Sequence, residues 1–317
     1  MTDPIFVRPD VEKLLAMLAA QPGPALNEVE PPVARQMYVE MSKLLDQPRG
    51  ELADVRDLAI AGPHGHAIPA RLYRPNLLLH PAPVLMYFHG GGWVIGNLDT
   101  HDSACAEIAR LLEIDVVSVD YRLAPEHRFP AAVEDCLAAT EWLARSPGEI
   151  DHAVSGIILA GDSAGGNLAA VVSQQRHGKL PVPIIAQWLI YPGTDMTASS
   201  GSIEAFGDGY LLTKESLDFF IGHYITEEAH FSHPQASPMM AESLDNQPPT
   251  LVFTCGLDPL RDQGRAYAAR LIEAGVRTIF READGQIHGS LTLRAGIPSA
   301  QDDLASNIDA LKALIAE

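Results

Sequence analysis

The 317-residue chain lacks most features of secreted, membrane-spanning and nucleic-acid-binding proteins. It has three cysteines and no Cys-x-x-Cys pair, which fits buried thiols in a reducing compartment. Its 22 basic and 41 acidic residues give a net charge of −19, so a nucleic acid would be repelled and is not an expected partner. No run approaches the roughly 18 apolar residues of a membrane span, and no charged segment followed by an apolar one marks a signal peptide. We therefore expect a cytoplasmic protein that does not bind a membrane.

Repeated units and common cofactor motifs are absent as well. No internal repeat is visible, which argues against solenoids and propellers. The chain has no His-Glu-x-x-His motif, no glycine-rich phosphate loop and no dinucleotide fingerprint, and its 12 histidines are scattered. We therefore expect neither a metal site nor a cofactor. The length and the 47% hydrophobic content suit one large α/β domain with an appendage, or two ordinary domains.

Segments with strand patterns alternate with helical ones along most of the chain. This alternation predicts an α/β fold, with a mostly parallel sheet covered by helices on both faces. The first two strand segments read as a hairpin. The eight predicted strands are residues 55–60, 67–73, 84–88, 115–120, 156–160, 184–190, 250–254 and 277–281.

Two stretches do not follow the alternation. Helical patterns at residues 8–20 and 31–46 precede any strand, and a later insertion contains a helix at about residues 214–224. These helices need a surface to cover, which predicts a helical cap over the sheet. The sequence therefore divides into cap residues 1–50 and 193–246 and core residues 51–192 and 247–317.

The pentapeptide Gly-Asp-Ser-Ala-Gly occupies residues 161–165, between a strand pattern and a helix pattern. This is the context of a nucleophile elbow, in which the two glycines leave out Cβ atoms where strand and helix come close. Ser163 is then held in a strained conformation with its hydroxyl exposed. We predict that Ser163 is a nucleophile and that Asp162 is a structural hydrogen-bonding residue.

Three glycines after His89 follow the third predicted strand. One interpretation is a flexible turn, but the apolar strand before the glycines and Trp93 after them favour an ordered loop. Backbone N–H groups in such a loop stabilise the negative oxygen of a tetrahedral intermediate. We predict an oxyanion hole formed by Gly91, Gly92 and Ala164, and a loop-ordering role for His89.

A base and an acid should follow the serine in the order Ser, Asp or Glu, His. His288 is the one histidine beyond the last predicted strand, and it lies in a glycine-flanked loop. His101 lies in a loop near the site but does not fit this order. Asp258 directly follows the penultimate strand and is favoured as the acid that orients His288. Asp262 and Asp284 are competitors for that role.

The motifs together resemble the bacterial hormone-sensitive lipase family, also called family IV carboxylesterases, from about residue 55 to the end. The resemblance implies an α/β-hydrolase fold with a helical cap and carboxylesterase activity. It rests on His-Gly-Gly-Gly-Trp at 89–93, Asp-Tyr-Arg-Leu-Ala-Pro-Glu-His at 120–127, Gly-Asp-Ser-Ala-Gly-Gly at 161–166, Gly-Tyr-Leu-Leu-Thr at 209–213, Gly-Leu-Asp-Pro-Leu-Arg-Asp at 256–262 and Ile-His-Gly at 287–289.

Two residues of the last loop depart from the family pattern. Ser290 stands where the family usually has an aromatic residue, and Gln286 replaces an apolar one. We expect Ser290 to leave room in the substrate pocket. The other expected pocket residues flank the motifs at the carboxyl edge of the sheet and are Trp93, Tyr210, Leu211 and Ile287.

The predicted function is hydrolysis of short- to medium-chain carboxylic esters through an acyl-enzyme intermediate. The same three side chains would also suit an amide, lactone or deacetylation substrate. A ligand-binding protein without activity is a further alternative, although such a protein has no need of His288. The expected partner is a small ester molecule, and the chain is a candidate homodimer.

Overall fold

The computed structural model describes residues 5–20, 23–76 and 81–316. In this part of the chain eight strands form one sheet in the order β1-β2-β4-β3-β5-β6-β7-β8. β2 pairs antiparallel with β1 and β4, and the other neighbours are parallel, which confirms the predicted mostly parallel sheet. The strands are β1 Asp54–Ala61, β2 Ala67–Arg74, β3 Ala82–Phe88, β4 Asp115–Val119, β5 Val154–Asp162, β6 Ile184–Ile190, β7 Thr250–Leu257 and β8 Thr278–Ile287.

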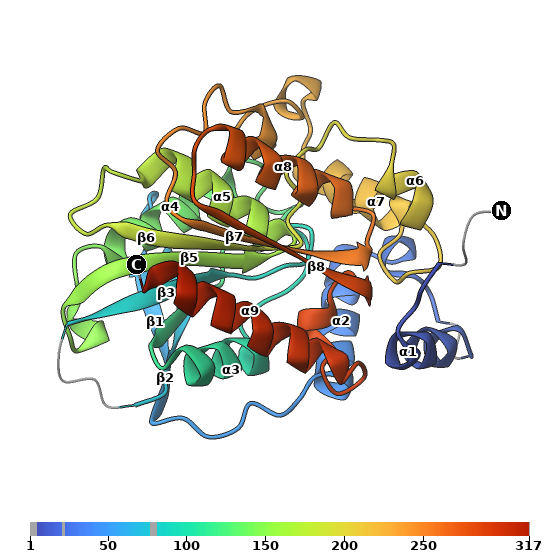
Figure 1. Cartoon of the computed structure of the whole chain (residues 1–317), viewed down its shortest axis with the longest axis horizontal. Coiled ribbons are helices and arrows are strands. Elements are labelled where there is room, and N and C mark those ends of the chain that lie inside the picture. Colours follow the sequence, from blue (N-terminus) through green and yellow to red (C-terminus); the bar gives the residue numbers. More distant parts are fainter. Residues whose placement is uncertain (1–4, 21–22, 77–80, 317) are drawn as a thin grey trace.

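Helices cover both faces of the sheet (Figure 1). α4 (Ala131–Leu143), α5 (Ala164–Arg176) and α8 (Arg261–Glu273) lie on one face, and α3 (Asp102–Leu112) and α9 (Ser299–Ile315) lie on the other. Every residue of β4 and β7 is buried, as expected for strands enclosed on both sides. The two faces hold two large apolar cores, which fix the strand ends on which the functional loops lie.

Four further helices lie beyond the carboxyl ends of the parallel strands (Figure 1). They are α1 (Pro9–Ala20), α2 (Pro31–Leu45), α6 (Ser202–Phe206) and α7 (Lys214–Tyr224). Val11 and Leu14 of α1 share a third apolar cluster with Leu45 of α2 and Phe206 of α6. The two segments predicted to form a cap therefore contact each other, although the division into four segments stays a prediction.

β8 is longer than the sequence indicates. The sequence predicts a strand at residues 277–281 with a glycine-flanked loop after it, whereas β8 continues to Ile287. Gly285 does adopt a positive φ of 67°, but the pairing with β7 resumes after a register shift, with Leu257 opposite Ile287. β7 and β8 therefore end side by side, which decides where the next residue of each strand lies.

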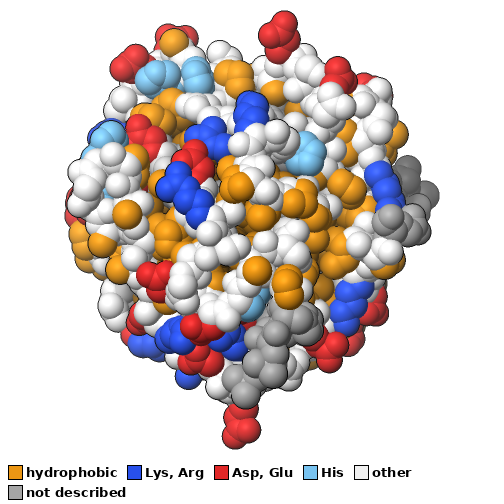
Figure 2. Space-filling model, turned by 90° about the vertical axis from the view of Figure 1, so that its left-hand side faces the viewer, with side chains coloured by type: hydrophobic (Ala, Val, Ile, Leu, Met, Phe, Trp, Pro, Cys, Tyr) orange, Lys and Arg blue, Asp and Glu red, His pale blue; other side chains and the backbone are white. Residues whose placement is uncertain are grey.

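The end of the molecule opposite α1, α6 and α7 has a surface of mixed character. Figure 2 faces the left-hand side of Figure 1, away from α1, α6 and α7, and shows hydrophobic side chains mixed with charged ones of both signs. No helix in the described ranges is both long and apolar enough to cross a membrane.

Candidate active site

Ser163 lies in the tight turn between β5 and α5, as the pentapeptide predicts. Its backbone has φ 55° and ψ −116°, a strained conformation for a residue with a side chain. A Cβ atom at Gly161 would lie 2.4 Å from the backbone of Gly165, and one at Gly165 would lie 1.9 Å from the carbonyl oxygen of Phe88. Only glycine fits at these two positions, so the motif follows from the close approach of strand and helix.

His288 connects Ser163 to Asp258. Its Nε2 lies 2.9 Å from Ser163 Oγ, and its Nδ1 lies 2.8 Å from Asp258 Oδ2. The buried Asp258 also accepts the N–H of Leu260 on Oδ1, at 2.7 Å. Because Leu257 pairs with Ile287 in the sheet, the next residues, Asp258 and His288, emerge side by side.

The two competing carboxylates have other surroundings. Asp262 accepts the backbone N–H of Ser202 at 2.9 Å and pairs with Arg261 at 3.0 Å, so it holds α6 against the start of α8. The side chain of Asp284 is exposed. Of the three candidates, Asp258 is the one in hydrogen-bond contact with His288, which supports its assignment as the acid.

The glycine loop presents its backbone to the same cavity as Ser163. Gly91, Gly92 and Ala164 all line this cavity. Gly91 and Gly92 have positive φ values of 113° and 59°, and the carbonyl of Gly91 accepts the N–H of Ile95 at 2.9 Å. Ala164 is the first residue of α5, where a backbone N–H has no acceptor within the helix. This geometry supports the predicted oxyanion donors.

His89 is buried below this loop and makes no contact with Ser163. Its Nδ1–H donates to the carbonyl of Gly90 at 2.8 Å, and its ring stacks on Tyr121 at 4.2 Å. Burial lowers the pKa of His89 to about 3, so the ring is neutral at working pH. These contacts support the predicted loop-ordering role.

Asp162 joins the nucleophile turn to the glycine loop. Its carboxylate accepts the hydroxyl of Tyr87 at 2.7 Å and the N–H of Gly90 at 2.8 Å, and it lies 3.2 Å from His101 Nε2. Burial alone would raise the pKa of Asp162, but His101 and these hydrogen bonds outweigh it and lower the pKa below its ordinary value. These contacts support the structural role predicted for Asp162, but its contact with His101 has no signal in the sequence.

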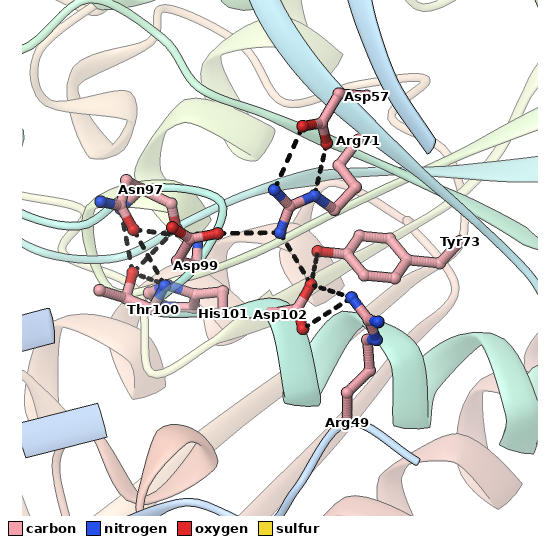
Figure 3. A network of polar contacts seen from close by, with 9 residues as sticks. All are labelled: Arg49, Asp57, Arg71, Tyr73, Asn97, Asp99, Thr100, His101 and Asp102. Carbon is pink, nitrogen blue, oxygen red and sulfur yellow. Dashed lines mark hydrogen bonds and ion pairs between the residues drawn. The ribbon is translucent and has the colours of Figure 1, made fainter. Parts of the chain in front are cut away.

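His101 is itself anchored from outside the site (Figure 3). Its Nδ1 lies 2.9 Å from Thr100 Oγ1, in a turn where Asn97 accepts the N–H of Thr100. Arg71 binds Asp99 within that turn and Asp102 just after His101, at 2.9 Å each. The polar network therefore reaches from β2 to the residue beside the nucleophile. The network joins residues from separate segments, and no sequence pattern predicts such contacts.

The cavity above Ser163 has a volume of about 690 Å³. Its described walls include the acidic residues Glu40, Asp162 and Asp195 but no lysine or arginine. Most of the lining is apolar. α1, α2 and α7 contribute to it, with side chains that include Met17, Leu18, Met37, Met41, Leu217 and Ile221. Such a cavity suits an uncharged, largely apolar ligand.

The structure separates the five predicted pocket residues into two groups. Trp93 and Leu211 line the cavity, but Tyr210, Ile287 and Ser290 do not. Ile287 is fully buried in the cluster with α1, because β8 continues to this residue and turns its side chain away from Ser163. Tyr210 packs edge-on against Phe206 at 5.6 Å.

Ser290 faces the interior behind the last loop. Its Oγ lies 3.7 Å from Cys255 Sγ, and it lines a separate cavity of about 10 Å³ with Trp188 and Asn307. The expectation that Ser290 enlarges the substrate pocket is therefore wrong, since any space left by the missing ring lies elsewhere. Within the ranges that the structure describes, no three His, Cys, Asp or Glu side chains group closely enough to hold a metal ion.

The chain belongs to the α/β-hydrolase family, in its branch related to hormone-sensitive lipase. The family profile, described as alpha/beta hydrolase fold, matches residues 85–292, more than half of the chain. Among curated relatives, ethyl acetate hydrolase from Pseudomonas putida is 35% identical over 90% of this chain and 91% of its own. Carboxylesterase NlhH from Mycobacterium tuberculosis is 34% identical over 98% of both chains.

A third relative matches at higher identity over a shorter stretch. Carboxylic ester hydrolase LipN from Mycobacterium tuberculosis is 46% identical over 76% of this chain, which spans 65% of LipN. Among solved structures, an ester hydrolase from the metagenome of Lake Arreo, complexed with a bipyridine phosphonate derivative, has a TM-score of 0.92 and 36% identity, covering 98% of this chain and 100% of that one. A thermostable esterase from Pseudomonas putida has a TM-score of 0.91 and 31% identity, covering 98% of each chain.

Proposed function

We propose that the protein is a serine carboxylesterase that hydrolyses short- to medium-chain esters of small molecules. The observation that carries this proposal is the continuous hydrogen-bonded chain from Ser163 through His288 to Asp258, at the wall of a large apolar cavity. Relatives named as carboxylesterases and ethyl acetate hydrolase, similar over nearly the whole chain, support the same activity.

In the first half of the reaction Ser163 Oγ attacks the ester carbonyl carbon. Its proton passes to His288 Nε2, which lies 2.9 Å away, while the Asp258 carboxylate holds the opposite side of the ring and stabilises its positive charge. The carbonyl oxygen becomes negative and accepts hydrogen bonds from the N–H groups of Gly91, Gly92 and Ala164. The C–O bond then breaks, and the alcohol leaves with the proton from His288.

In the second half a water molecule replaces the alcohol. His288 takes a proton from the water, and the resulting hydroxide attacks the acyl group on Ser163. The same backbone N–H groups stabilise the second oxyanion. The bond to Ser163 Oγ breaks, the proton returns to the serine, and the carboxylic acid leaves.

The lining of the cavity indicates which esters can bind. Its apolar walls, formed largely by residues within 17–45 and 211–221, favour hydrocarbon on the acyl or alcohol side. Carboxylates without a neighbouring lysine or arginine in the described lining disfavour anionic substrates. We also infer a cytoplasmic location, which the three free, buried cysteines support. Dimer formation stays a prediction.

Aryl esters of increasing acyl length test the function directly. Wild-type protein should release the aryl alcohol with saturation kinetics, and Ser163→Ala should lower kcat by roughly 10⁶-fold if the three residues act as a unit. Circular dichroism should be unchanged in the variant. Equal turnover by wild type and Ser163→Ala would refute the proposal.

A further inference from the structure

The loop that carries His288 rests on an unexpected polar contact. Gln286, which stands where the family usually has an apolar residue, is fully buried. Its Nε2 donates to Asp303 Oδ2 of α9 at 3.1 Å, and its Oε1 accepts the N–H of Ile287 at 3.1 Å. A buried amide is retained at such a position only if both of its ends are satisfied. The Asp303 carboxylate therefore helps to hold the loop that carries His288.

Arg8 supplies the other half of this contact from the segment that leads into α1. Its guanidinium donates two hydrogen bonds to Asp303, Nη1 to Oδ2 at 2.7 Å and Nη2 to Oδ1 at 3.1 Å. Its Nε donates to the carbonyl of Asp284 at 2.8 Å, and its backbone N–H donates to the carbonyl of Gly285 at 3.2 Å. In Figure 1 this segment passes the carboxyl end of β8.

We propose that Arg8 is a positioning residue for His288, acting through Asp303 and the end of β8. The proposal rests on the proposed esterase function and assigns a role in it to the N-terminal segment. Arg8 and Asp303 are each about one-fifth exposed, so their charge-assisted pair is partly shielded from water. The planar guanidinium of Arg8 donates to both Asp303 carboxylate oxygens and to the Asp284 carbonyl in one fixed fork geometry, which the single ammonium nitrogen of a lysine lacks.

Apolar packing acts on the same part of the chain. Ile287, directly before His288, lies in one cluster with Val11 and Leu14 of α1. The N-terminal segment therefore fixes residues 284–287 by hydrogen bonds on one side and by packing on the other. His288 must keep contacts of 2.9 Å and 2.8 Å at its two ring nitrogens. Since a displacement of about 1 Å at a reacting group costs on the order of 100-fold in rate, this support governs turnover.

The test compares Arg8→Gln, Arg8→Lys and Asp303→Asn on one aryl ester. We expect Arg8→Gln and Asp303→Asn each to lower kcat by about 10- to 100-fold with KM unchanged, because Arg8 does not line the cavity. Arg8→Lys should recover part of the loss. The double variant Arg8→Gln/Asp303→Asn should lose less than the product of the two single losses, because both substitutions remove the shared Arg8–Asp303 pair.

Arg56→Gln is the matched control. Arg56 lies on β1, at the sheet edge opposite β8, and pairs with Asp54 and Asp151, so its loss should leave kcat unchanged. Wild-type kcat in folded Arg8→Gln and Asp303→Asn would overturn the inference. If Arg8→Gln fails to fold, Asp303→Asn, which keeps the shape of the side chain, decides alone. No turnover by the wild-type protein would instead contradict the proposed function.

Discussion

Asp258→Asn is the substitution whose effect follows most directly from the geometry. Asp258 uses Oδ1 for the N–H of Leu260 and Oδ2 for Nδ1–H of His288. An asparagine side chain has a single oxygen, and the N–H of Leu260 requires that oxygen at the position of Asp258 Oδ1. The amide NH₂ then faces His288, so Nδ1 must accept a hydrogen bond and the ring proton moves to Nε2. In that tautomer His288 cannot take the proton of Ser163.

The expected loss is roughly 10⁴-fold in kcat, the effect of the wrong tautomer in a triad of this kind. At about 1.36 kcal/mol for each factor of ten, this corresponds to about 5.4 kcal/mol of lost transition-state stabilisation. Activity above the uncatalysed rate should remain, because the backbone donors of Gly91, Gly92 and Ala164 are untouched. Stopped-flow or steady-state hydrolysis of an aryl ester measures the change, with circular dichroism as the check on folding.

Asp262→Asn and Asp284→Asn are the matched controls. Asp262 binds Ser202 and Arg261, the side chain of Asp284 is exposed, and neither carboxylate touches His288 in the structure. Both variants should keep activity within about tenfold of wild type, since they leave the tautomer unchanged. Near-normal kcat in Asp258→Asn, or a larger loss in either control, would refute the reasoning.

Three further outcomes are expected. Across a series of esters with longer acyl chains, kcat/KM should rise about fourfold per methylene, because each buried methylene contributes about 0.8 kcal/mol. It should fall once the acyl chain reaches the floor of the cavity. Efficient hydrolysis of long-chain triglyceride emulsions would contradict this. Ser290→Phe should leave acyl preference unchanged but destabilise the fold by about 1–3 kcal/mol in urea unfolding, because a ring overfills a cavity of about 10 Å³; a narrowed substrate range with unchanged stability would contradict it. Burial lowers the pKa of His89 to about 3 from an ordinary value of ~6.5. Between these two pH values the unfolded chain binds a proton at His89 that the folded chain does not. The free energy of unfolding should therefore fall as the pH falls through this range. His89→Asn should make the urea midpoint less dependent on pH between 7 and 4, and an unchanged dependence would show that His89 does not contribute.

The parts of the site that the sequence predicts are those fixed by local backbone geometry. The turn at Ser163 needs glycine on both sides, as the close approach of Gly161 and Gly165 demonstrates, so the motif is readable without the fold. The role of Asp258 can be predicted from the sequence because this residue directly follows a strand. The end of the strand sets its position, and no distant residue is needed to infer it.

The parts that the sequence misses depend on side-chain direction and on contacts between distant segments. Ile287 and Ser290 follow motif residues closely, but the unforeseen extension of β8 turns Ile287 into the α1 cluster, and Ser290 lies toward Cys255. Arg8 and Asp303 are 295 residues apart, and no periodicity connects them. Neighbours in sequence are therefore a poor guide to which side chains line the pocket.

Covalent labelling with a fluorophosphonate, followed by peptide mass spectrometry, tests the central claim most directly. Such a reagent reacts with a serine that a neighbouring base activates and leaves a stable tetrahedral phosphorus adduct. We predict one adduct per chain, on the peptide that contains Ser163, with loss of ester hydrolysis in proportion to labelling and no adduct in Ser163→Ala. An adduct on another residue, or full hydrolysis by completely labelled protein, would contradict it.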